Sequence, residues 1–170
     1  IYTGSTPEGH FALGTIVAGI KAALQQGLTA DRLQLIFIGA CDALAREVKR
    51  QGGCEDLIVF VSHQPHRIAQ RLQQQADGLI FLAYDGDGNK GVVSTKFFEY
   101  LALKKPILPF SVRQGSDIEM LLNRFAGKSV FLNSSDEICR LLADESIGAR
   151  SCSFPVCDDP DRLKALYEEY

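Results

Sequence analysis

Short apolar runs and amphipathic segments alternate along the whole chain. The apolar runs are Ile1–Thr3, Leu33–Ile38, Leu57–Val61, Gly78–Leu82, Pro106–Phe110 and Ser129–Leu132. They are continuous, without the apolar-polar alternation of a half-exposed strand. Continuous runs of this length are typical of parallel strands that are covered on both faces. The pattern therefore predicts six buried strands.

The segments between these runs carry apolar residues three or four positions apart, which predicts amphipathic helices. The clearest stripes are Leu13, Ile16, Val17, Ile20 and Leu24; Val93, Phe97, Tyr100 and Leu101; Ile118, Leu121, Leu122 and Phe125; and Ile138, Leu141 and Leu142. Helix-start signals agree with the stripes. Ser116 with Glu119 and Ser134 with Glu137 have the spacing of capping boxes, and Asp159–Pro160 predicts the start of a last helix.

The order strand–helix, repeated six times, predicts the α/β class. We expect a Rossmann-like, doubly wound and mostly parallel six-stranded sheet, with helices on both faces and a C-terminal helix. The length of 170 residues fits one domain. We expect its body over residues 1–148, and a linker and C-terminal helix over residues 149–170. Ligands of such sheets bind beyond the carboxyl ends of the strands.

Composition excludes some functions and partners. The formal net charge is −3, so no basic surplus favours nucleic acid. The five cysteines have no Cys-x-x-Cys spacing, which favours reduced thiols in a cytoplasmic protein. No apolar run reaches the roughly 20 residues that span a bilayer. The chain begins with strand-like Ile1, so we expect a fragment of a longer protein that lacks its N-terminal part.

A glycine-rich segment follows the fourth apolar run and carries two weak motifs. Gly86-x-Gly88-x-x-Gly91 matches a dinucleotide fingerprint, but it starts too far from its strand and no ribose-binding acid follows the next strand. The same segment resembles the opening of a calcium loop, but lysines occupy two positions that calcium needs, at Lys90 and Lys96. We therefore expect neither a dinucleotide nor a metal site here.

The histidines are His10, His63 and His66. His63 and His66 follow the third predicted strand, on the ligand-facing side, where either could contact a ligand. The alternative is that they are surface loop residues. No nucleophile elbow and no phosphate-binding P-loop occurs in the chain.

The segment Ser94–Glu99 carries the strongest candidate chemistry. Ser94 and Thr95 can cap a helix whose free N–H groups suit an anion, and Lys96 adds a full positive charge. Glu99 lies one turn further on the same face. A cation beside a carboxylate suits a ligand with a phosphate and a hydroxyl pair, such as a nucleotide. The alternative is an exposed lysine and a glutamate that stabilises the helix.

Several segments together resemble a known family. They are Ala76–Leu82, Ser94–Ala102 and Lys105–Leu108, with support from Ile1–Ser5, Leu35–Gly39 and Val59–Val61. This pattern is similar to the C-terminal, donor-binding half of retaining "group 1" nucleotide-sugar glycosyltransferases of the GT-B fold. The resemblance covers most of residues 1–145, and the Lys-x-x-Glu-Tyr-Leu-Ala run is its most specific part.

The resemblance implies roles for individual residues. Glu99 matches the second glutamate of the family's Glu-x7-Glu motif, which holds the donor ribose. Lys96 matches a lysine near the donor phosphates and is the catalytic candidate. Gly4 and Ser5 match the glycine turn that faces the diphosphate. The full donor-binding set that we expect is Gly4, Ser5, His63, Tyr84, Gly91, Ser94, Thr95, Lys96 and Glu99.

The chain also departs from the family pattern. Gly91 stands where the first motif glutamate belongs, Ser5 stands near the usual arginine, and Leu13 stands near the usual lysine. His10 and Lys90 are the residues that could replace a lost cation. Two phosphate-binding cations and one sugar-binding carboxylate are therefore missing or moved.

The resemblance implies a retaining, hexosyl-transferase type of enzyme of polysaccharide biosynthesis. It would use a nucleoside-diphosphate sugar, with no cofactor and no metal. A saccharide or lipid-linked acceptor would bind through the absent N-terminal domain, so this fragment alone would be inactive. We expect a cytoplasmic location, with the missing half in contact with the inner face of the membrane. The alternatives are a non-catalytic nucleotide-binding or partner module of the same fold, a nucleotide-sugar epimerase half and, last, a dinucleotide enzyme.

Overall fold

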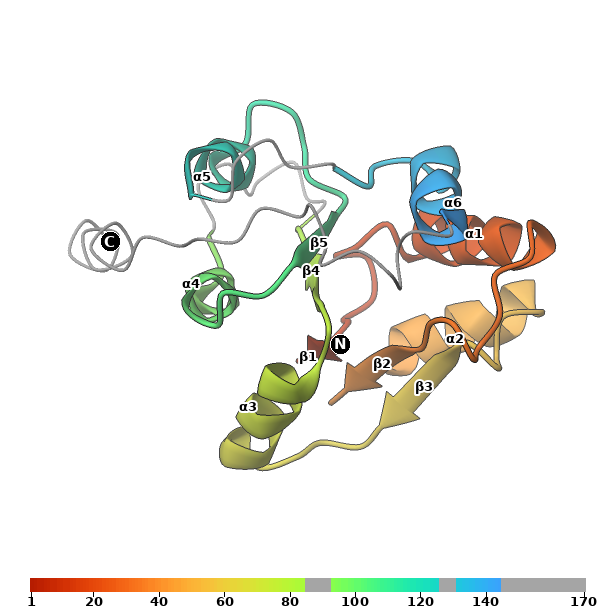
Figure 1. Ribbon diagram of the computed structural model, residues 1–170, viewed down its shortest axis with the longest axis horizontal. Helices are drawn as coiled ribbons and strands as arrows, with labels where there is room; N and C mark the ends of the chain where they lie inside the picture. The colour runs from red at the N-terminus through yellow and green to blue at the C-terminus, as the bar shows by residue number, and fades with distance from the viewer. Residues whose placement is uncertain (85–92, 126–130, 145–170) are drawn as a thin grey trace.

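Strands and helices alternate through the part of the chain that the computed structural model describes, residues 1–84, 93–125 and 131–144 (Figure 1). Its strands are β1 (Tyr2–Thr3), β2 (Leu35–Ile38), β3 (Ile58–Val61), β4 (Leu79–Leu82) and β5 (Ile107–Phe110). Its helices are α1 (Leu13–Gln25), α2 (Asp42–Gln51), α3 (His66–Gln75), α4 (Thr95–Ala102), α5 (Asp117–Phe125) and α6 (Ser135–Ala143). The α/β class is confirmed.

The paired strands are parallel and fall into two small sheets. In the first sheet, β2 pairs with β1 on one side and with β3 on the other. In the second, β4 pairs with β5. Two hydrogen bonds join β1 to β4: the Ile1 nitrogen donates to the Gly78 carbonyl, and the Ile80 N–H donates to the Ile1 carbonyl, both at 2.7 Å. The strands therefore follow the order β3-β2-β1-β4-β5, and the direction of winding reverses between β1 and β4.

The prediction of a six-stranded sheet is wrong for the described residues, which hold five strands in two sheets. Of the sixth apolar run the structure describes Phe131 and Leu132, and Leu132 forms a bridge with Phe110. The Leu132 N–H donates to the Pro109 carbonyl at 3.0 Å, and the Leu132 carbonyl accepts from Ser111 N–H at 3.1 Å. One bridged residue extends the sheet edge but does not make a strand. The predicted linker and C-terminal helix lie outside the described residues.

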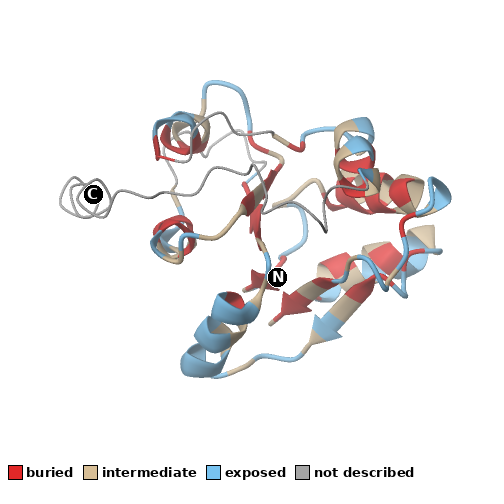
Figure 2. Cartoon of the chain, in the orientation of Figure 1, coloured by how far each residue is buried: buried red, intermediate tan, exposed pale blue. Residues whose placement is uncertain are grey.

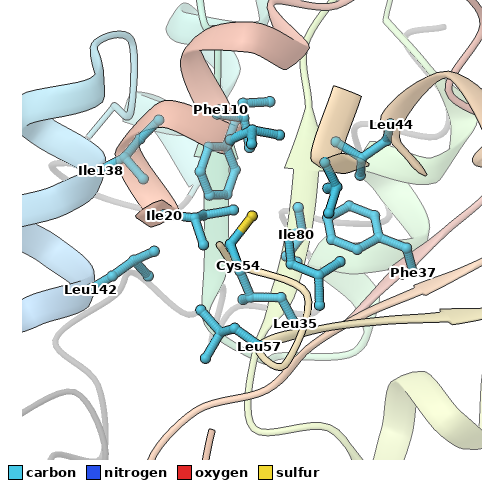
Figure 3. Close-up of a cluster of buried hydrophobic side chains, with 14 of the residues drawn as sticks. Ile20, Leu35, Phe37, Leu44, Cys54, Leu57, Ile80, Phe110, Ile138 and Leu142 are labelled. Carbon is cyan, nitrogen blue, oxygen red and sulfur yellow. The ribbon is translucent and has the colours of Figure 1, made fainter. Parts of the chain in front are cut away.

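Helices cover both faces of the strands, as predicted. Along β4, Ile80 and Leu82 belong to a hydrophobic cluster with residues of α1, α2 and α6. Leu79 and Phe81 belong to a second cluster with α4 and α5. Figure 3 shows the first cluster, in which Ile20, Ile80, Phe110 and Ile138 converge from different elements. Figure 2 shows the exposed outer faces of the helices and the mostly buried strands, except β3, which is partly exposed, so the prediction that every strand is buried is wrong for β3.

The helix start predicted at Ser134 has both hydrogen bonds of a capping box, whereas at Ser116 the serine half is present and the Glu119 carboxylate accepts from the Gly115 N–H instead. Ser134 Oγ accepts from the Glu137 N–H at 3.2 Å, and the Glu137 carboxylate accepts from the Ser134 N–H at 3.0 Å. This is a complete capping box for α6. At the start of α5, Ser116 Oγ accepts from the Glu119 N–H at 3.2 Å. Such caps satisfy N–H groups that the helix itself leaves free.

The helices of the described residues are too short or too polar to cross a membrane. A cavity of about 360 Å³ opens at the amino ends of the strands, between residues such as Leu35, Gly78, Pro106 and Leu142. The other end of the strands, where doubly wound sheets bind ligands, carries the candidate site.

Candidate functional site

The loops that follow β1 and β2 touch through their backbones. The Gly4 N–H donates to the Ile38 carbonyl at 2.8 Å, and the Thr6 N–H donates to the Ala40 carbonyl at 3.0 Å. Gly39 permits this approach, because a Cβ there would lie 2.1 Å from the Gly4 carbonyl oxygen. Its φ of +122° also favours glycine. A glycine pair therefore fixes the shape of the β1 loop.

Helix α4 begins beside this loop. Ser94 is its N-cap, and the Ser94 hydroxyl accepts from the Lys96 N–H at 3.3 Å. The first turn of a helix presents N–H groups and a partial positive charge to an anion. Thr95 is exposed and is the first helical residue, so Ser94 alone acts as the cap.

Lys96 reaches across from α4 to β1. Its Nζ lies 4.7 Å from the centroid of the Tyr2 ring, in a cation–π arrangement. A Cβ on Gly4 would lie 2.1 Å from Lys96 Nζ, so the ammonium occupies the space that the glycine leaves open. Burial lowers the pKa of Lys96, and the nearby negative charge of Glu99 partly opposes that shift. An anion bound here would gain from a partly desolvated positive charge.

Three buried side chains outside the predicted set lie around β1 at this site. The Tyr2 hydroxyl donates to the Ser5 carbonyl at 2.7 Å, and burial raises its pKa. Cys41 is buried with its Sγ 3.6 Å from the Gly4 carbonyl, and burial raises the pKa of its thiol. Tyr100 accepts a long hydrogen bond of 3.4 Å from the Thr3 N–H, and burial raises its pKa to about 12. They are neutral at physiological pH, so they add no charge that competes with an anion.

The floor of the site is tied to the opposite side of β1. Gln73 of α3 is buried, and its Nε2 donates to the Thr3 hydroxyl at 2.6 Å. Thr3 thus joins α3 to β1 directly below the site. The signal for this contact was a glutamine in the last turns of a helix, which sequence reasoning reads as surface.

A second group of side chains lies at the same end of the strands. The His10 ring, in the loop after β1, stacks on the Tyr84 ring, just after β4, at a centroid distance of 4.6 Å. The Phe11 ring meets Tyr84 edge-on at 5.8 Å. These contacts join the loop after β1 to the end of β4, where the winding of the sheet reverses.

The structure brings together most of the predicted residues that it describes. Gly4 and Lys96 are in contact, Ser5 and Ser94 flank them, and the charge of Glu99 acts on Lys96. Tyr84 belongs to the aromatic group instead. His63 is exposed after β3, which β2 separates from β1 in the sheet. Gly91 and Lys90 lie outside the described residues.

The arrangement can bind an anion and a neighbouring polar group. It combines one desolvated ammonium, a helix start and a glycine turn, with a half-buried carboxylate one turn along α4. Within residues 1–84, 93–125 and 131–144, no three His, Cys, Asp or Glu side chains gather as a set that could hold a metal ion. The expectation that ligand binding needs no metal stays a prediction.

Comparison with known proteins gives a match in structure but none in sequence. No protein-family model matches the chain. No curated protein matches it in sequence either. Among solved structures, it is similar to a mutant of S. aureus TarM, a GT-B glycosyltransferase, in complex with Fondaparinux, alpha-GlcNAc-glycerol and UDP. The TM-score is 0.54 at 12% identity. The chain has a glycosyltransferase-like fold.

The match covers 87% of this chain but 29% of TarM. The chain thus spans less than a third of the length of this neighbour. At this level of identity the likeness concerns the fold, and the site residues must be argued from their own geometry.

Proposed function

We propose that this chain is the donor-binding domain of a nucleotide-sugar glycosyltransferase. The observation that carries the proposal is the Lys96 ammonium, which lies against Gly4 where the winding of the sheet reverses. Doubly wound sheets bind their ligands in the crevice that forms at this reversal, beyond the carboxyl ends of the strands. The glycosyltransferase-like fold and the UDP bound in TarM support the same assignment.

Lys96 and the α4 start would hold the diphosphate. During transfer, the bond from the sugar to the diphosphate breaks and negative charge accumulates on the leaving phosphate oxygen. Fixed positive charge and N–H groups lower the energy of that state. Glu99, one turn along α4, would accept hydrogen bonds from the ribose hydroxyls. We propose a retaining transfer of a hexose to a saccharide or lipid-linked acceptor, which a further domain would bind.

The decisive experiment replaces the charge of Lys96 while keeping its stem. Lys96→Met retains packing on the Tyr2 ring and removes the ammonium. We expect UDP, GDP or ADP to bind the wild-type chain in calorimetry, and the variant to bind about 10- to 100-fold more weakly, since charge-assisted hydrogen bonds contribute about 1.5–3 kcal/mol. Lys49→Met, on an exposed position of α2, is the matched control. Equal affinity of Lys96→Met and wild type would show that Lys96 has no such role.

A non-catalytic nucleotide-binding module is the second candidate. The observation that favours it is that Ser5, in the glycine turn, carries no charge. Among the described residues, Lys96 is the cation that lies against Gly4. This module would bind the nucleoside diphosphate with the same Lys96 dependence. It would show no sugar transfer even when the chain is joined to an acceptor-binding domain.

A further inference from the structure

The aromatic group of His10, Phe11 and Tyr84 has no part in the anion site described above. Its rings are stacked closely, with 32° between the planes of His10 and Tyr84. Tyr84 nevertheless keeps 39% of its surface exposed. A tyrosine held by two aromatic neighbours and open on its remaining surface is a rigid platform for a ligand.

His10 adds a polar group to this platform. Its Nδ1 is buried and has no hydrogen-bond partner among the described residues. A buried polar atom without a partner costs free energy, which a bound hydroxyl can recover. The platform therefore combines an apolar ring face with one unsatisfied nitrogen.

The position of the platform follows from the two hydrophobic clusters. Phe11 packs against the cluster of α1, α2 and α6, on one side of the sheet. Glu99 lies on α4, whose apolar residues belong to the cluster on the other side. Gly4 and Lys96 meet at the end of β1, between the two sides. A ligand that extends from Glu99 over the diphosphate position therefore continues toward His10 and Tyr84.

From this geometry we infer that His10 and Tyr84 form the sugar subsite of the donor. The inference rests on the proposed function, because it assumes that ribose and diphosphate bind at Glu99 and Lys96. A pyranose ring presents a face of C–H groups, which packs on an aromatic ring, and a rim of hydroxyls, which hydrogen-bonds to an imidazole nitrogen. The nucleobase lies beyond the ribose, at the opposite end of the ligand, so it does not reach this platform.

The test compares a nucleotide with its sugar conjugate on the full 170-residue chain. Calorimetry is run with the pairs UDP and UDP-N-acetylglucosamine, GDP and GDP-mannose, and ADP and ADP-glucose. For the pair that binds wild type, we expect Tyr84→Ala to raise the Kd of the sugar conjugate about tenfold and leave the Kd of the nucleoside diphosphate unchanged. His10→Phe keeps the stacked rings, removes Nδ1, and should raise the Kd of the sugar conjugate alone.

Matched variants separate this effect from misfolding. Tyr84→Phe preserves the ring and should bind both ligands like wild type. Lys96→Met should weaken both ligands equally. If Tyr84→Ala unfolds the chain, as seen in thermal melting, His10→Phe carries the test.

The outcomes distinguish the two proposals. Equal losses for the nucleotide and the sugar conjugate in the His10 and Tyr84 variants, or no loss for either ligand, would overturn the sugar subsite while leaving nucleotide binding in place. If wild type binds none of the six ligands, the proposed function fails and the subsite fails with it.

Discussion

At the scale of single residues, the site depends on Gly4, which has no side chain. Gly4 has a φ of +141°, and any Cβ there would collide with Lys96 Nζ. The collision lies at the charged end of a flexible side chain, so Lys96 would swing away while the fold survives. Gly4 therefore controls the position of a charge, as well as the shape of a turn.

Replacing Gly4 tests this dependence. We expect Gly4→Ala to weaken binding of the nucleoside diphosphate at least tenfold, because the ammonium leaves its place above Tyr2. Gly27→Ala is the matched control, since Gly27 also has a positive φ, of +98°, but has no neighbour within 4 Å of a Cβ. Both variants should lose about 1 kcal/mol of unfolding free energy from backbone strain. Equal nucleotide affinity in the two variants would contradict the role of Gly4.

The buried ammonium also predicts a dependence on pH. Since burial lowers the pKa of Lys96, the folded chain binds this proton less tightly than the unfolded chain does. The contribution of Lys96 to the free energy of unfolding should therefore increase as the pH rises from the lowered pKa to the ordinary one. Nucleotide affinity should fall as pH rises through the lowered pKa. Calorimetry and denaturant titration from neutral to alkaline pH measure both trends, which Lys96→Met should abolish and Lys49→Met should retain.

At the scale of elements, α1 and α6 pack unusually closely. A Cβ on Gly19 of α1 would lie 2.5 Å from the Cβ of Ile138 and 2.9 Å from the Ser135 carbonyl oxygen, both in α6. These neighbours are a branched side chain near its root and a backbone atom, neither of which moves freely. Small residues allow such approach between helices, and enlarging them strains the contact.

Gly19→Ala should therefore destabilise the chain by about 1–3 kcal/mol, although alanine is the better helix former. Gly14→Ala, on the same helix, is the control, because its added Cβ would meet the flexible ends of Glu47 at 3.3 Å and Gln51 at 3.9 Å. We expect Gly14→Ala to be neutral or slightly stabilising. Chemical denaturation of the two variants measures the difference, and a loss of similar size in both would point to the helix itself and not to its contact with α6.

The elements themselves could be predicted because their signals are local. Apolar runs and helical stripes are read within one segment, and so are the caps at Ser116 and Ser134. Contacts between distant segments, such as that of Cys41 with Gly4 and that of Gln73 with Thr3, left no such signal. Pairing of His10 with Tyr84 joins residues far apart in sequence. The sequence therefore predicted Gly4, Ser5 and the α4 residues of the candidate site, but not Tyr2, Cys41 and Gln73, which lie next to them.

At the scale of the whole molecule, the alternation of elements predicted the doubly wound fold but not the extent of its sheet. Whether an apolar run becomes a strand depends on how many residues find a neighbour to pair with, and Leu132 finds one at Phe110. The order of strands likewise depends on which edges meet in space. The location of the site, at the carboxyl ends of the strands, could be predicted from the topology alone.

The junction between β1 and β4 has a kinetic consequence. Its hydrogen bond from the Ile1 nitrogen to Gly78 spans 77 residues of sequence, whereas β4 and β5 lie much closer together in the sequence. Closing so long a loop costs chain entropy, and the contact stabilises the pairing only once the loop is closed. Distant pairings therefore form late in folding. The crevice is assembled on that junction. Ligand binding during refolding should therefore lag behind helix formation, and recovery of binding would report the last step of folding.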